Sequence, residues 1–276
     1  MNPLIWCRER LLVAGNPLAA SLLFAPEKEK ERILALRCLA SEIAASASEI
    51  SEPEVASSRL EWWRSALSEP DNPHPALRAV KESGADERLQ PADFEPLVDG
   101  VAAAIEQPRF ERFAELWQFC CRIGGSVSLL EARLLGVDDS DADSLRELGG
   151  AHYLTRVVRD LVIDARANRW LVPLDFQADY QVSRQDALEE RPSPAFAGLV
   201  RAMLAESVGR GDKAVARMAA SQRRRQVHLL AEWALGRRLA RIIDRRPQRL
   251  FNERVLPGHW GNVWTAWRAA RKALKA

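Results

Sequence analysis

The amino-acid sequence predicts an all-α protein that forms one helical bundle. Alanine and leucine are abundant, whereas glycine (14 of 276 residues) and the β-branched residues are sparse. Apolar residues recur at spacings of three and four, and strict alternation over the length of a strand is hard to find. Ala and Leu are strong helix formers, and this spacing gathers apolar side chains on one face of a helix. We therefore expect helices nearly throughout the chain.

Prolines, glycines and polar stretches mark where the expected helices begin and end. Pro26 begins a helix that runs past Ile50, the Trp62-Trp63 pair lies on the next one, and Gly136 closes a long apolar helix. Further along the chain we expect a helix from about 91 to 107, the apolar helix from about 110 to 135, a helix from 141–143 to about 167, a loop at 175–183, a helix from 194 to about 211, and others from about 212 and 221.

The chain shows no flexible linker and no fixed repeat, which favours a single domain. We expect this domain to cover residues 1–258. Residues 259–276 follow it as a basic, Trp-containing amphipathic helix.

Charge and cysteine content exclude several classes of function. Lys and Arg total 40 against 38 Asp and Glu, so the chain as a whole does not attract one type of charged partner. The arginines between 217 and 254 lack a nucleic-acid motif and interleaved aromatic residues, so we expect solvated helix faces and no nucleic-acid partner. No cysteine pair has CxxC spacing, which favours reduced, buried thiols in a cytosolic protein.

No stretch reaches the roughly 20 uninterrupted apolar residues that a membrane-spanning helix needs. We expect a cytoplasmic protein, either free or attached to the surface of the inner membrane. The C-terminal helix bears on that choice, because Trp260, Trp264 and Trp267 fall on one stripe with Val263, Ala270 and Leu274, and basic residues flank it. Such a pattern suits a membrane surface. A terminal helix that docks on its own core is the plainer alternative.

Two aspartates form the chief candidate for chemistry. Asp160 and Asp164 are four residues apart on an expected helix, so both carboxylates leave the same face. Arg156 and Arg159 lie beside them. Two carboxylates can hold Mg²⁺ while phosphate oxygens and waters complete its coordination, and nearby arginines can bind a diphosphate.

The residues around these aspartates distinguish a cavity site from an exposed ion pair. Val157, Val158 and residues 161–163 make the helix apolar nearly all round. A helix of this kind is buried. Charged side chains on it must be paired, bind a metal or line a wet cavity.

The stretch from Tyr153 to Pro173 resembles the second aspartate-rich motif of squalene and phytoene synthases, a helix Q-L-T-N-I-L-R-D-x-x-x-D followed by a basic turn and Y-L-P. Here it reads YLTRVVRD, then Asp164, then NRWLVP. Other landmarks follow in the family's order: the substrate helix at 33–50, W-W-R at 62–64, H-P at 74–75 and the F-C-C-R-I-G-G-S-V core helix at 119–127.

The resemblance implies an isoprenoid synthase-like bundle around a central cavity, in which two aspartate clusters bind Mg²⁺ and two prenyl diphosphates are joined head to head. On the matching positions it implies metal ligands at Asp160 and Asp164. Residues in contact with the substrate are implied at Phe119, Tyr153, Arg156, Arg159 and Arg169.

The family's first cluster, of the form D-D-x-x-D-E, is missing. Ala44, Ala45 and Ser48 stand where its aspartates are expected, and only Glu42 and Glu49 remain. Glu49 is therefore an additional candidate metal ligand. In this loss the chain is similar to the mitochondrial complex I assembly factor of the same family, which is regarded as non-enzymatic and attached to the inner membrane.

These observations leave two hypotheses. The first is a protein with a degenerate prenyltransferase site that binds an isoprenoid or another lipid, or assists assembly with a protein partner. The alternative is an active, Mg²⁺-dependent transferase that condenses farnesyl or geranylgeranyl diphosphate.

Overall fold

The computed structural model describes residues 2–13, 16–50, 52–137, 141–189 and 192–275. No strand lies within these ranges, so the predicted all-α class is confirmed. The first half contains α1 (Pro3–Leu11), α2 (Pro17–Ser21), η1 (Leu22–Phe24), η2 (Glu27–Glu29), α3 (Lys30–Ser48), α4 (Pro53–Leu67), α5 (Pro75–Ser83), η3 (Ala85–Glu87), η4 (Pro91–Phe94), α6 (Glu95–Ile105), α7 (Phe113–Cys120), η5 (Cys121–Gly125) and α8 (Ser126–Leu134). The second half contains α9 (Ala142–Arg166), α10 (Leu174–Tyr180), α11 (Arg184–Leu188), α12 (Pro194–Arg217), α13 (Ala220–Arg225), α14 (Val227–Arg245), η7 (Pro247–Phe251) and α15 (His259–Lys275).

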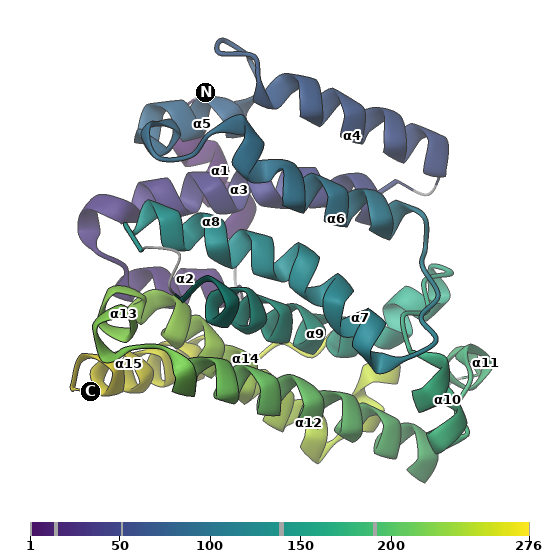
Figure 1. Ribbon diagram of the computed structural model, residues 1–276. Coiled ribbons are helices and arrows are strands. Elements are labelled where there is room, and N and C mark those ends of the chain that lie inside the picture. Colours follow the sequence, from purple (N-terminus) through teal and green to yellow (C-terminus); the bar gives the residue numbers. More distant parts are fainter. Residues whose placement is uncertain (1, 14–15, 51, 138–140, 190–191, 276) are drawn as a thin grey trace.

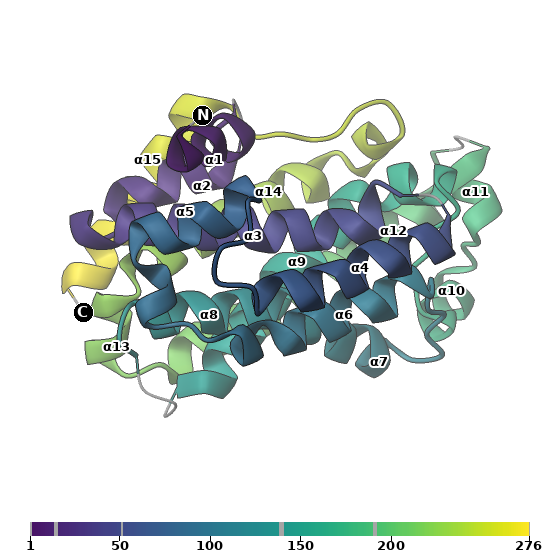
Figure 2. The same cartoon turned by 90° about the horizontal axis from the view of Figure 1, so that it is seen from above.

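The helices stack in successive layers, from α4 and α5 at one end to α12, α14 and α15 at the other (Figure 1). Helix α9 runs through the middle of the bundle in both views (Figures 1 and 2) and packs on α12, α14, α7, η5 and α8. On the other side of α8, helix α3 packs on α1, α4, α5 and α6. Helices α9 and α3 therefore form the centre of the fold.

The apolar helix expected at 110–135 is continuous but irregular. A single π-helical turn, η5, joins α7 to α8 and carries Gly124 and Gly125. Gly124 faces Gly149 of α9, and Gly125 faces Arg146 of the same helix. A Cβ built on Gly124 would lie 2.3 Å from the Gly149 carbonyl oxygen, so side chains at these positions would force the two helices apart.

Three sequence-based expectations were wrong. The helix expected from Pro26 past Ile50 begins at Lys30, after η2, and ends at Ser48. Residues 174–180 form helix α10 instead of a loop: Pro173 precedes its first residue, and the Asp175 carboxylate accepts a hydrogen bond from the Phe113 amide at 2.9 Å. Helix α12 also continues past Gly209 and Gly211 to Arg217. A Cβ on Gly211 would lie 2.2 Å from the Trp233 indole, so this glycine allows close helix packing and does not end the helix.

Candidate functional site

A cavity of about 1220 Å³ lies between α3, α9 and α14 and is also lined by residues of α6, η5 and the 254–257 segment. One wall is a stripe of four polar residues on α9: His152, Arg156, Asp160 and Asp164. They are spaced by four, so they lie on the same face of the helix. The opposite face is apolar and buried. Its Val158, Leu161 and Val162 side chains are at most 2% exposed.

Asp160 is held by two arginines. The Arg254 guanidinium donates two hydrogen bonds to its carboxylate, both at 2.9 Å, and Arg159 Nε donates a third at 2.9 Å. The Asp160 side chain is 17% exposed. Burial alone would raise the pKa of this carboxyl, but the hydrogen bonds and charges of Arg159 and Arg254 outweigh it and lower the pKa to about 2. Asp160 is therefore ionised and neutralised by protein groups.

Asp164 pairs with one arginine, Arg169, whose Nη2 lies 2.7 Å from Oδ1. The turn after α9 makes this contact possible, because Asn168 adopts a left-handed conformation with φ of 61°. Asn tolerates that conformation better than most non-glycine residues. Burial raises the pKa of Asp164, and Arg169 offsets only part of that effect.

Arg156 differs from its neighbours because it has no hydrogen bond or ion pair to any residue that the structure describes. It lines the cavity between His152 and Asp160 on the stripe. The side chain is exposed to the cavity. Desolvation by the cavity wall and the positive charge of Arg159 lower the pKa of its guanidinium, but a guanidinium is not deprotonated in proteins. The side chain is a free cation in the cavity.

Helix α3 forms the wall that the family's first aspartate cluster would occupy. Ser41, Ala44, Ala45 and Ser48 line the cavity there, and Glu49 lies exposed at its rim. Glu42 is not part of the lining and instead pairs with Arg10 at 2.5 Å. No group of three or more His, Cys, Asp or Glu side chains placed to hold a metal occurs within the described ranges. This donor set does not fit the Mg²⁺ cluster that the resemblance implies.

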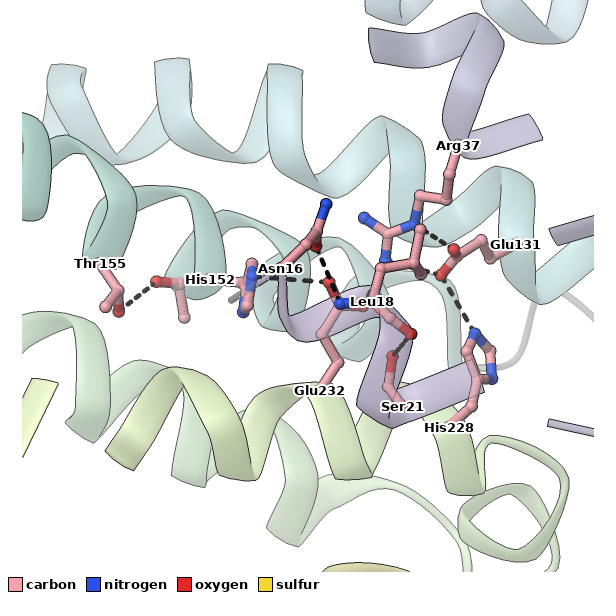
Figure 3. A network of polar contacts seen from close by, with 10 residues as sticks. Asn16, Leu18, Ser21, Arg37, Glu131, His152, Thr155, His228 and Glu232 are labelled. Atoms are coloured by element: carbon pink, nitrogen blue, oxygen red, sulfur yellow. Dashed lines mark hydrogen bonds and ion pairs between the residues drawn. The ribbon is translucent and has the colours of Figure 1, made fainter. Parts of the chain in front are cut away.

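Arg37 and Glu232, which line the cavity, belong to a buried ionic network (Figure 3). Arg37 of α3 pairs with Glu131 of α8 and with Glu232 of α14. His228 Nε2 lies 3.3 Å from the Glu131 carboxylate, and the side chains of both residues are fully buried. Burial would raise the pKa of Glu131, but the charge of Arg37 dominates and lowers it to about 2. The network joins three helices that meet at the cavity.

His152 connects this network to the α9 stripe. Its Nε2 lies 3.6 Å from Glu232 Oε1 (Figure 3). Burial lowers the pKa of His152 to about 4, and the nearby positive charges of Arg156, Arg37 and Arg159 act in the same direction, against the opposing charge of Glu232. The imidazole is therefore neutral at pH 7 and adds no positive charge to the cavity.

The residues singled out in the sequence lie together. All the candidate metal ligands and substrate-contacting residues line this cavity: Phe119, Tyr153, Arg156, Arg159, Asp160, Asp164, Arg169 and Glu49. Phe119 and Tyr153 contact each other edge-to-face, with ring centroids 6.3 Å apart. Burial raises the pKa of the Tyr153 phenol, which stays protonated.

Two parts of the site were missed from the sequence. Arg254 lies 94 residues beyond Asp160, in a segment with no pattern that indicates a cavity. Arg37 and Glu232 of the network carried a usable signal, because each is a single charge within an otherwise apolar helical stretch. Such residues are seldom fully buried unless they are paired.

The all-α bundle and its polar-walled cavity define an isoprenoid synthase-like fold. The family model of squalene/phytoene synthases matches residues 14–268. The chain belongs to the squalene/phytoene synthase family.

Curated relatives agree with this assignment at low identity. The 15-cis-phytoene synthase of Enterobacter agglomerans is 27% identical over 131 residues, which cover 47% of this chain and 44% of that protein. The phytoene synthase of Pseudescherichia vulneris is 30% identical over 138 residues, covering 48% and 45%. The matched regions thus span less than half the length of these relatives.

Solved structures extend the likeness over nearly the whole chain, at the level of fold. A dehydrosqualene synthase in complex with a ligand superposes with a TM-score of 0.80 at 15% identity, covering 99% of this chain and 96% of that one. A squalene synthase from Alicyclobacillus acidocaldarius has a TM-score of 0.66 at 15% identity, covering 90% and 94%.

Proposed function

We propose that this protein binds an isoprenoid diphosphate, or a lipid with a similar anionic head group, in its cavity without carrying out metal-dependent head-to-head condensation. One observation carries the proposal. Both carboxylates of the α9 stripe are neutralised by arginine, while the facing wall of α3 presents Ala and Ser. The metal ligands of the family reaction are thus occupied on one wall and replaced on the other.

The charges around the stripe favour an anion bound directly by protein. Four guanidinium groups, those of Arg156, Arg159, Arg169 and Arg254, line the cavity near only two aspartates. Arg156 is the free member of this set. A guanidinium recognises phosphate oxygens through parallel N–H donors, so it can take over the charge neutralisation that Mg²⁺ supplies elsewhere in the family.

The rest of the cavity suits a hydrocarbon chain. Leu97 and Val101 of α6, Ile123 of η5 and Leu239 of α14 line it. Its volume of about 1220 Å³ exceeds the roughly 300–1,000 Å³ of ordinary small-molecule pockets. Members of this family bind isoprenoid diphosphates, and a single prenyl chain with its head group at Arg156 is the arrangement we propose.

The test compares binding with turnover. Purified protein is titrated with farnesyl diphosphate in EDTA, and diphosphate release is measured separately with Mg²⁺. We expect saturable binding in EDTA, weakened roughly tenfold to a hundredfold in Arg156→Gln because one charge-assisted contact is lost. The matched control is Arg224→Gln, which removes an exposed arginine that is not part of the cavity lining.

The alternative enzyme hypothesis makes the opposite prediction. Diphosphate release that requires Mg²⁺ and disappears in Asp160→Ala would overturn the non-catalytic proposal. Absence of binding in EDTA, with binding restored by Mg²⁺, would also contradict it.

A further inference from the structure

Helix α15 is anchored to the core by small residues. Asn262, Ala266, Ala270 and Ala273 form its buried face and are at most 6% exposed. Arg238 Nη1 donates a hydrogen bond to Asn262 Oδ1 at 3.0 Å. The helix packs on α14 and beside α2 (Figure 2). Its inner face is therefore complete without the tryptophans, and Ala270 belongs to this face instead of the predicted tryptophan stripe.

The tryptophans of α15 face outward. Trp260 is 83% exposed, Trp264 is 59% exposed and Trp267 is 36% exposed. The rings of Trp264 and Trp267 stack with centroids 4.9 Å apart, and Leu274 continues the same apolar stripe. Clustered exposed tryptophans are costly in water and mark a surface that is covered by a partner.

The charges beside this stripe have one sign. Arg268, Arg271, Lys272 and Lys275 are all exposed, and residues 259–275 contain no Asp or Glu. The Arg271 guanidinium lies 4.8 Å from the centre of the Trp267 ring. The surface of an ordinary protein partner carries both positive and negative charges. An anionic lipid surface carries negative charge everywhere, so it matches a face whose charges are all positive.

We propose that α15 binds the surface of a membrane that contains anionic lipids. The helix would lie in the interfacial plane, with its tryptophans at the depth of the head groups and its basic residues against lipid phosphates. In the described ranges no helix is long and apolar enough to cross a bilayer, and this mode of attachment does not require one.

The proposed surface adjoins the cavity. Leu256, in the segment that leads into α15, lines the cavity and is 50% exposed. Asn262 of α15 also lines the cavity, but it is buried. Leu23 of η1 is 55% exposed, and η1 contacts α15. Helix α15 therefore borders the cavity with its buried face and carries the tryptophans on its other face.

The experiment measures flotation of the full chain with vesicles of phosphatidylcholine alone and of phosphatidylcholine with 30% phosphatidylglycerol. We expect binding to the anionic vesicles that weakens as salt is raised, and much less binding to the neutral ones. Quenching of tryptophan fluorescence by brominated lipids should accompany binding, because three of the nine tryptophans lie on this face.

Two variants separate the apolar and electrostatic parts of the contact. A triple Trp260→Ala, Trp264→Ala, Trp267→Ala variant should lose bromolipid quenching and most vesicle binding. A triple Arg271→Glu, Lys272→Glu, Lys275→Glu variant should bind anionic vesicles at least roughly a hundredfold more weakly, since each basic residue near such a surface contributes about a fivefold factor. Trp62→Ala and Lys213→Glu are matched controls, because both side chains are exposed on other helices.

Circular dichroism melting checks that the variants are folded. We expect them to fold normally, because the substituted side chains are exposed. Wild-type protein that does not bind anionic vesicles, or a tryptophan variant that binds as well as wild type, would overturn the proposal. Concentration-dependent self-association that the tryptophan substitutions abolish, without vesicle binding, would assign the face to a second copy of the chain and would likewise overturn it. None of these outcomes depends on whether the cavity binds an isoprenoid.

Discussion

At the scale of single residues, arginines decide what the two aspartates of α9 can bind. Asp160 and Asp164 occupy the positions where the family resemblance implies metal ligands, yet each has an arginine partner. A paired carboxylate must break charge-assisted hydrogen bonds before it can coordinate a cation. The free Arg156 next to them is the group that we propose binds an anion.

Asp160→Asn should lower the free energy of unfolding by about 1–2 kcal/mol at pH 7, because it leaves Arg159 and Arg254 without their partner. The pKa of Asp160 is lowered to about 2 from an ordinary value of 3.8, so its contribution is fully present above pH 3.8 and is lost as the pH falls towards 2. Urea unfolding at several pH values measures this. Equal acid sensitivity of wild type and variant in that range would contradict the assignment.

His152 should destabilise the native state in mild acid. Its pKa is lowered from 6.5 to about 4, so between these values the unfolded chain binds a proton that the native state does not. Stability should fall as the pH drops from 6.5 towards 4, by up to about 3 kcal/mol. In urea unfolding at several pH values, His152→Asn should show a smaller change in the free energy of unfolding over this range. The prediction fails if the two profiles remain parallel over that range.

At the scale of helices, glycines set how closely the central helices pack. Gly124 and Gly149 bring η5 and α9 together, and Gly211 lets α12 lie against Trp233 of α14. Trp233 Nε1 donates a hydrogen bond to Asp212 Oδ1 at 3.0 Å, which fixes the ring over Gly211. Packing of this kind cannot be distinguished from a helix end in the sequence, because glycine is frequent in both.

Two substitutions on α12 test this interpretation. Gly211→Ala should destabilise the protein by about 1–3 kcal/mol, because the new methyl group meets the Trp233 indole. Gly209→Ala is the matched control two residues away. Apart from the backbone of its own helix, no atom that the structure describes lies within 4 Å of its added Cβ. Alanine should therefore stabilise the helix by about 0.5–1 kcal/mol. Thermal melting of both variants measures the difference, and effects of the same sign would refute the packing role of Gly211.

At the scale of the whole molecule, ion pairs between protein side chains link the elements around the cavity. Ionic contacts at Asp160 and around Arg37 connect α3, α8, α9, α14 and the 254–257 segment across the cavity. Removal of divalent metal should therefore leave the fold intact. In EDTA we expect an unchanged melting temperature and an undiminished rise in melting temperature with farnesyl diphosphate. A melting temperature that falls in EDTA and recovers with Mg²⁺ would show that a metal belongs to the native state.

Much of this protein was determined by its sequence alone. Helical spacing and the Ala- and Leu-rich composition predicted the all-α class, and the apolar surroundings of Asp160 and Asp164 indicated a buried helix. The ordered motifs of the squalene/phytoene synthase family predicted the family itself. These are local properties, carried by residues a few positions apart.

The tertiary structure decided which groups meet. Arg254 reaches Asp160 across 94 residues, and Arg37 reaches Glu131 and Glu232 across 94 and 195 residues. The tertiary structure also places the α15 tryptophans on the outside, because alanines on the opposite face of the helix pack against the core. Charge neutralisation and burial depend on distance in space, and sequence periodicity describes only one helix at a time.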